Sequence, residues 1–169
     1  MNYSRHDLVQ TDATMNQMRN AIYHLARFMK KNGVKKIDER LRRMGANMAR
    51  TIFNYWKPID IVDASNVKDV ITTIYQKILS SSVTIEINEI SKVITIKDYK
   101  CALCKYKYED LDISGCEVLI ALIAEYINLI SKSSQSSSAL FVTPLNVVES
   151  KSYGDNVCSI ELKYKIGGK

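Results

Sequence analysis

The chain has 169 residues, of which 46% are hydrophobic and 25% are charged, and its formal net charge is +6. These proportions are typical of one folded domain and argue against a disordered chain. No segment reaches the roughly 18 apolar residues of a membrane-spanning helix, and we expect no signal peptide. Four cysteines at irregular spacing are too few for a disulfide framework, so we expect a reducing, cytoplasmic compartment. The charge favours an acidic protein, an anionic membrane surface or a nucleic acid without choosing among them.

Residues 1–10 are expected to form a flexible N-terminus, and residues 11–169 a single domain. The first helix is predicted to begin with Thr11 or Asp12 as its N-cap and to end at Lys31. One face carries a heptad-like apolar seam, formed by Met15, Met18, Ile22, Leu25 and Met29. A seam of this period packs against another helix. That partner is either the next helix of the same chain or a helix of a second subunit, and both possibilities stay open.

The second helix is predicted from Ile37 to Trp56, because its apolar residues recur at steps of three and four. Gly45 and Ala49 are small residues one turn apart. A glycine inside a helix costs about 1 kcal/mol, so we expect another helix or the sheet to pass very close there. The opposite face is basic and includes Arg40, Arg42, Arg43 and Arg50. This face either contacts an acidic partner or anionic lipid, or is simply solvated.

Ser65 is the predicted cap of a third helix, whose apolar face extends from Val67 to Leu79. Apolar and polar residues then alternate in Val83–Asn88 and again in Val93–Lys97, which predicts a β-hairpin. Residues 98–112 have no clear period and are rich in lysine and tyrosine. We predict a functional or packing loop there.

Ser114 and Glu117 have the spacing of a capping box at the start of the next helix. That helix is apolar nearly all round, so it is predicted to be the central buried helix. Its length, and Glu125 within it, argue against a membrane span. The serine-rich residues 131–138 are expected to form a flexible loop.

Two strands complete the chain. The first covers Phe141–Val147, and its Pro144 favours an edge or a bulge. A turn at Gly154 and Asp155 leads into the alternating strand Cys158–Ile166. The element order is α-α-α-β-β-α-β-β. We therefore predict an α+β fold with helices packed on a four-stranded antiparallel sheet.

Two stretches resemble the small subunits of the transport protein particle (TRAPP) family, which is related to the 4-vinyl reductase domains of prokaryotes. The first is LRRMGANMARTIFNYW at Leu41–Trp56, continuing to Lys68–Ile71, and the second is ESKSYGDNVCSIEL at Glu149–Leu162. The predicted element order is that of the TRAPP small subunits as well. The resemblance implies a noncatalytic assembly subunit that dimerises through its N-terminal helices and acts as a scaffold in vesicle tethering or small-GTPase regulation.

The resemblance also implies the partners. They are a second copy or a paralogous subunit, a small GTPase bound by a composite surface of several subunits, and peripheral contact with an anionic internal membrane. Some TRAPP subunits carry a cysteine that takes an acyl chain into an apolar tunnel. Ile61 stands near that position here, so covalent acylation is not expected. The candidates for an apolar pocket, or for plain core, are Met44, Met48, Ile71, Ile74, Leu122 and Tyr126.

The alternative function is a sensor domain similar to the 4-vinyl reductase domains, holding an apolar small molecule or a metal. Those relatives often bind zinc through several cysteines. Cys158 and Cys116 are the matching candidates here, but Ser150 stands where another ligand is expected. Because structural zinc needs four good ligands, we expect no metal and no cofactor. Cys101 and Cys104 have the spacing of a zinc knuckle or redox pair, but a lone pair more simply indicates loop packing.

Chemistry is sparse elsewhere. The histidines are His6 and His24, and no nucleophile is placed near either by pattern, so no catalytic residue is expected. There is no glycine-rich phosphate loop. The lysines and tyrosines of Tyr99–Tyr108 suit stacking with nucleic acid, but Glu109 and Asp110 follow directly. We therefore expect neither an enzyme nor a nucleic-acid partner.

Overall fold

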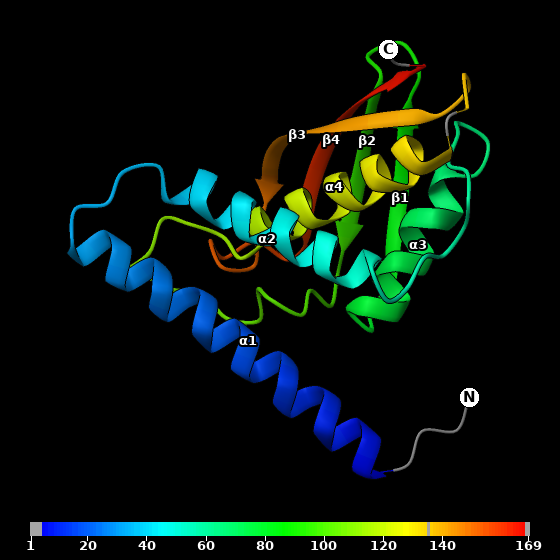
Figure 1. The fold of residues 1–169 in the computed structure, drawn as a ribbon. Helices are drawn as coiled ribbons and strands as arrows, with labels where there is room; N and C mark the ends of the chain where they lie inside the picture. Colours follow the sequence, from blue (N-terminus) through cyan, green and yellow to red (C-terminus); the bar gives the residue numbers. More distant parts are fainter. Residues whose placement is uncertain (1–4, 135, 168–169) are drawn as a thin grey trace.

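The computed structural model describes residues 5–134 and 136–167. The predicted α+β class and the element order are confirmed (Figure 1). The elements are α1 (Arg5–Lys31), α2 (Ile37–Phe53), α3 (Val67–Ile78), β1 (Val83–Asn88), β2 (Val93–Asp98), α4 (Cys116–Ser134), β3 (Leu140–Glu149) and β4 (Cys158–Ile166).

The four strands form one antiparallel sheet in the order β1-β2-β4-β3. Helix α4 lies against one face of the sheet, and α2 packs on the outer side of α4 (Figure 1). Because α4 is covered on both sides, it is buried nearly all round, as its apolar sequence predicts. The edge strand β3 changes register after Pro144, which fits a residue that cannot donate to the ladder.

Helices α2 and α4 approach each other closely at Gly45. A Cβ atom added to Gly45 would lie 2.0 Å from the carbonyl oxygen of Val118. Only a glycine fits against backbone at that distance, which accounts for a residue that otherwise weakens a helix. Ala49, one turn later, is also fully buried. The two small residues therefore let the helix backbones come together.

Helix α1 lies apart from this layered body and runs beside the loop that connects β2 to α4 (Figure 1). It makes few close contacts with α2. Ile22, Tyr23, Ala26 and Met29 are buried, whereas Leu25 and Phe28 are 42% and 65% exposed. None of the helices in the described part of the chain is long and apolar enough to span a bilayer.

The ends of the first two helices differ from the prediction. Helix α1 begins at Arg5, so the N-cap predicted at Thr11 or Asp12 is wrong. The helix continues through both residues, since a capping residue type only permits a helix start and does not enforce one. Residues 1–4 of the predicted flexible N-terminus lie outside the described residues. Helix α2 ends at Phe53, before the predicted Trp56.

The predicted cap of α3 is also wrong. Asn66 occupies the N-cap position, and Asp63 Oδ1 accepts hydrogen bonds from the backbone N–H groups of Ser65 and Asn66. These two amides precede Val67, and no side chain caps the first turn of α3, so the Asp63 carboxylate holds the turn before the helix.

The start of α4 is capped by half of the predicted box. Ser114 Oγ accepts a hydrogen bond from the N–H of Cys116, but Glu117 turns to the guanidinium of Arg42 on α2. At its other end α4 extends to Ser134, so residues 131–134 of the predicted flexible loop are helical. Ser131 is buried there and donates to the Leu140 carbonyl, which ties the last turn to β3.

Candidate metal centre

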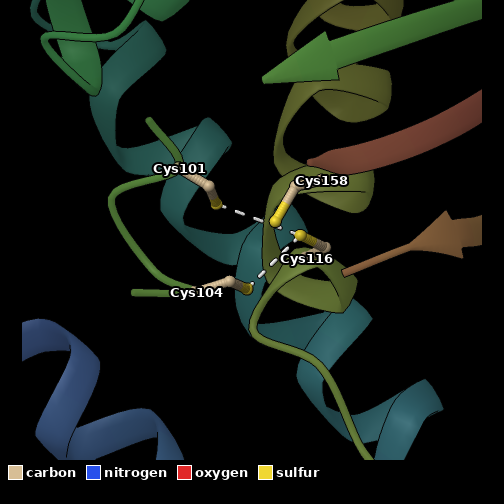
Figure 2. A group of neighbouring side chains, drawn as sticks. All are labelled: Cys101, Cys104, Cys116 and Cys158. Carbon is tan, nitrogen blue, oxygen red and sulfur yellow. Dashed lines mark hydrogen bonds between the residues drawn. The ribbon is translucent and has the colours of Figure 1, made fainter. Parts of the chain in front are cut away.

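All four cysteines of the chain converge at one buried point (Figure 2). Cys101 and Cys104 lie in the loop after β2, Cys116 is the first residue of α4, and Cys158 is the first residue of β4. Their sulfur atoms all lie within 4.8 Å of one another. The Cys104 and Cys116 sulfurs are 3.4 Å apart, and those of Cys101 and Cys116 are 4.0 Å apart. None of the four residues is more than 4% exposed.

Sheet register explains how distant cysteines meet. The last residue of β2, Asp98, pairs with Cys158 at the start of β4. Cys101 and Cys104 follow Asp98 by three and six residues, so the loop holds them close to the end of β2, where β4 begins. The Asp98 carboxylate accepts from the Lys100 N–H and the Ser81 hydroxyl, which fixes the turn out of β2. Ser114 and Gly115 then bring the chain into α4 beside them.

A group of buried serines lies against the sulfur atoms. Ser114 Oγ is 3.4 Å from Cys104 Sγ and 2.7 Å from the hydroxyl of Ser150. Ser150 in turn bonds Ser152 at 2.8 Å and lies 3.9 Å from Cys158 Sγ. All three serines are at most 1% exposed. Such hydroxyls are costly in an apolar core and are suited to orienting and stabilising thiolates.

Two further groups donate directly to the sulfur atoms. The Lys151 N–H donates to Cys158 Sγ at 3.5 Å, and the Tyr23 hydroxyl of α1 donates to Cys104 Sγ at 3.4 Å. Cys116 lies at the N-terminal end of α4, where the helix dipole favours negative charge. The surroundings therefore stabilise thiolate sulfur from several directions.

The cluster does not behave as four ordinary thiols. Burial opposes ionisation of Cys104, but hydrogen bonds from Cys101, Cys116, Cys158 and Ser114 outweigh it and hold the pKa of Cys104 well below its usual value. The pKa of Cys101 is raised well above normal by its hydrogen bonds to Cys104 and Cys116, and by burial. The hydrogen bonds around Cys104 therefore favour its thiolate, which is the form that binds a metal ion.

The geometry fits one four-coordinate metal ion. With a zinc–sulfur distance of about 2.3 Å, the sulfurs of a tetrahedral site lie about 3.8 Å apart. The observed separations of 3.4 and 4.0 Å, with none beyond 4.8 Å, bracket that distance. An iron–sulfur cluster places several atoms between its cysteines and requires wider spacing. Four sulfur ligands also leave no open position for substrate, which is the pattern of a structural site.

From the sequence, Cys116 and Cys158 are the zinc candidates, and Ser150 stands where another ligand is expected. In the structure Ser150 is a neighbour of the sulfurs, and Cys101 and Cys104 complete the set of four. The reason for expecting no metal therefore does not hold. The pairing of β2 with β4 would have indicated the complete ligand set. The Cys101–Cys104 pair follows the end of β2, and Cys158 is the first residue of β4.

The other predicted site residues lie apart from this centre. Ile71, Ile74, Leu122 and Tyr126 are fully buried core, while Met44 and Met48 line a surface groove of about 580 Å³ between α1 and α2. The candidate pocket residues therefore do not surround one cavity. The full lining of the groove is Met29, Arg40, Arg43, Met44, Asn47, Met48, Thr51 and Ile52.

The predicted basic face is divided. Arg42 pairs with Glu117 and Arg50 pairs with Glu125, so both hold α2 against α4. Arg40 and Arg43 are exposed at the rim of the groove. In the predicted turn, Gly154 has a φ of 108°, which favours glycine, and the Asp155 carboxylate accepts from the Ser150 N–H. That turn therefore helps to place Ser150 beside the cysteines.

In the predicted α1 seam, Ile22 and Met29 are buried within the chain, and Met15 and Met18 are half-buried. Leu25 points to solvent. Part of the seam therefore packs inside the chain, and the rest remains as exposed apolar surface on α1.

No family model and no curated protein matches the chain. Among solved structures, it is similar to a trafficking protein particle complex subunit 3 from Naegleria fowleri, covalently bound to palmitic acid. The TM-score is 0.69, the identity is 13%, and the match covers 93% of this chain and 98% of that one. The chain has the fold of a trafficking protein particle subunit. The relation to 4-vinyl reductase domains stays a prediction.

Proposed function

We propose that the chain is a noncatalytic assembly subunit similar to the TRAPP small subunits, which dimerises through α1 and α2 and acts as a scaffold in vesicle tethering or small-GTPase regulation. The fold shared over nearly the whole of both chains supports the trafficking context. The observation that carries the assembly role is the surface of α1 and α2. There, Leu25 and Phe28 are exposed beside a groove lined by methionines.

The chemistry of this surface suits a helical partner. Phe28 is 65% exposed on a helix with few contacts to its neighbour α2. Met29, Met44, Met48 and Ile52 form the apolar part of the groove, and methionine side chains adapt to varied partner shapes. A second copy of α1, or the α1 of a paralogous subunit, would cover Leu25 and Phe28. Arg40 and Arg43 at the rim would contact acidic residues of a partner or an anionic membrane.

The test is the oligomeric state of the purified chain by size-exclusion chromatography with light scattering. We expect a dimer at micromolar concentration, and we expect Phe28→Glu to convert it to a monomer. Ile90→Glu is the matched control, because Ile90 is 98% exposed on the distant β1–β2 turn. A monomeric parent chain, or a dimer that persists in Phe28→Glu and dissociates in Ile90→Glu, would contradict the proposal.

Affinity purification from the native host then identifies the partner. Co-purification of a paralogous subunit or a small GTPase supports the trafficking role. Because a GTPase is expected to bind a composite surface of several subunits, we expect the single chain to show no nucleotide-exchange activity.

The alternative function is a sensor domain that holds an apolar small molecule or a metal. The four-cysteine cluster supports metal binding and gives no support to small-molecule binding. A site with four sulfur ligands is closed and has no position to report on a small molecule. We therefore assign the cluster a structural role within the assembly subunit.

A further inference from the structure

We propose that Cys101, Cys104, Cys116 and Cys158 bind one zinc ion, and that this ion holds the loop on which α1 docks. The link from α1 to subunit assembly rests on the proposed function, whereas the zinc site and the docking of α1 rest on contacts within this chain.

Zinc is the metal that this ligand set favours. Four thiolates at tetrahedral spacing bind Zn²⁺, whereas Mg²⁺ and Ca²⁺ need oxygen ligands. Each thiol that binds zinc must lose its proton, so a site with four thiolates and one Zn²⁺ carries two negative charges. The Lys151 N–H, the Tyr23 hydroxyl and the start of α4 supply compensating dipoles. A plain apolar core would not place these donors and three serines around the sulfurs.

The loop between β2 and α4 has little regular structure of its own. Residues 99–115 contain no helix or strand. Leu103 is fully buried, but Tyr99 and Tyr106 are more than half exposed. Three of the four cysteines lie in this loop or at its end, and Cys158 belongs to the sheet. One ion bound by all four would therefore join the loop and α4 to the sheet.

The same loop is the main polar surface that α1 contacts. The guanidinium of Arg19 donates two hydrogen bonds, of 3.0 and 2.8 Å, to the carbonyl of Ala102, which lies between Cys101 and Cys104. The hydroxyl of Tyr23 donates to Cys104 Sγ and accepts from the Gly115 N–H at 3.0 Å. Arg19 is only 7% exposed, so its charge depends on that carbonyl being in place.

Further along α1 the contacts continue with the same spacing. Arg27 pairs with Asp110, and Lys30 donates to the Asp110 carbonyl and the Asp112 carboxylate. The rings of Tyr23 and Tyr108 lie 4.0 Å apart. Residues 19, 23, 27 and 30 follow one another at steps of four, four and three, so they share one helix face. That face meets the loop, and the orientation of α1 depends on the loop conformation.

The metal is tested on the full chain by native mass spectrometry and by cobalt substitution. We expect one zinc ion per chain, and Co²⁺ in its place should give the visible bands of a tetrahedral thiolate complex. Cys104→Ser should lose the metal at least about tenfold more readily, because a hydroxyl is a poor zinc ligand. Ser91→Ala, at an exposed serine on the distant β1–β2 turn, is the control and should retain it. A chain that binds neither Zn²⁺ nor Co²⁺ under reducing conditions would overturn the site.

The docking of α1 is tested by limited trypsin digestion, since Arg27 of α1 is cut only when the helix opens locally. Removing zinc with a chelator should speed cleavage after Arg27 by at least about tenfold, and should leave cleavage after Arg50 of α2 nearly unchanged. Equal cleavage rates at Arg27 with and without zinc would overturn the docking role, as would an equal acceleration at both sites.

A second variant separates docking from folding, in case cysteine variants do not fold. Arg19→Ala should retain zinc yet speed cleavage after Arg27, because it removes both bonds to Ala102 while leaving the sulfurs intact. Loss of zinc in Arg19→Ala would contradict the proposal that docking of α1 depends on zinc and that zinc binding does not depend on docking.

Different results would refute the proposed function and the zinc site. A zinc-loaded monomer would refute dimerisation and leave this inference standing, whereas a metal-free dimer would do the reverse.

Discussion

Helices α1 and α2 are attached to the molecule in different ways. Helix α2 packs backbone against backbone on α4, with Gly45 at the contact and Ala49 buried one turn later. Helix α1 buries Ile22, Ala26 and Met29 in the core, but its polar contacts are made to a loop without regular structure. Two helices that pack backbone against backbone hold each other directly, but a helix bonded to an irregular loop depends on whatever fixes that loop. We therefore expect the position of α1, and not that of α2, to respond when the loop changes its conformation.

The largest expected effect comes from filling the α2–α4 contact. Gly45→Ala places a methyl group against the Val118 carbonyl oxygen, and backbone there cannot move without displacing α4. Overpacking of this kind costs about 3 kcal/mol or more, which exceeds the gain of about 1 kcal/mol in helix propensity. Chemical denaturation measures the loss. Asn47→Ala, on the exposed side of the same helix, should stay within about 0.5 kcal/mol of the parent.

The ion pair of Arg42 and Glu117, which also joins α2 to α4, is expected to contribute less to stability. Arg42→Ala removes the partner of Glu117, a carboxylate only 8% exposed, and should lower the free energy of unfolding by about 2 kcal/mol. Arg50→Ala is the comparison, because the Arg50 side chain is 57% exposed and its pair with Glu125 should contribute less. If both variants lose the same stability in denaturation experiments, burial does not distinguish the two pairs.

On the α1 side, Tyr23→Phe removes one hydroxyl that joins α1, Cys104 and Gly115. We expect the free energy of unfolding to fall by about 1 kcal/mol. Unlike Gly45→Ala, this variant should loosen α1 without loosening α2. Amide exchange should speed up in α1 and at Gly115, and should stay unchanged in α2. Uniform acceleration across the chain would show that α1 and α2 unfold as one cooperative unit, so that the two helices are not attached differently.

The smallest effect concerns the exposed end of the α1–loop contact. The guanidinium of Arg27 holds the pKa of Asp110 below its ordinary value. Since the folded-state pKa is lowered, the stabilising effect is present above the usual aspartate pKa of about 3.9 and is lost as the pH falls through the folded-state value. Arg27→Ala should raise the pKa of Asp110 in an NMR titration, and Arg27→Lys should restore part of the shift. An unchanged pKa would remove this contact from the account.

Periodicity predicted most of the elements, because they have an apolar face of period two or near 3.6, and α4 was predicted from an apolar run that the core buries nearly all round. Helix ends were harder. Asn66 could not be identified as the N-cap of α3 from local pattern, since Ser65 is an equally suitable residue type and neither side chain caps the helix. Glu117 has the spacing of a capping box, but its use depends on Arg42, which is 75 residues away in sequence.

The cysteine cluster illustrates the same limit. Its four members are separated by 3, 12 and 42 residues in the chain, and only the pairing of β2 with β4 brings the last one to the others. Local spacing favoured loop packing for Cys101 and Cys104. The serines around them carry no recognisable motif either, because Ser114 and Ser150 meet only in the folded chain. Sequence pattern predicts elements well, but a site assembled across elements requires the register between them.

The most direct test is amide hydrogen exchange of α1 and α4, measured on the full chain with zinc bound and after its removal. We expect loss of zinc to speed exchange between Arg19 and Lys30 by at least about tenfold, while the amides in the middle of α4 stay protected. Unchanged exchange in α1 after verified loss of the metal would contradict the claim that the cysteine cluster holds the docking surface of this helix.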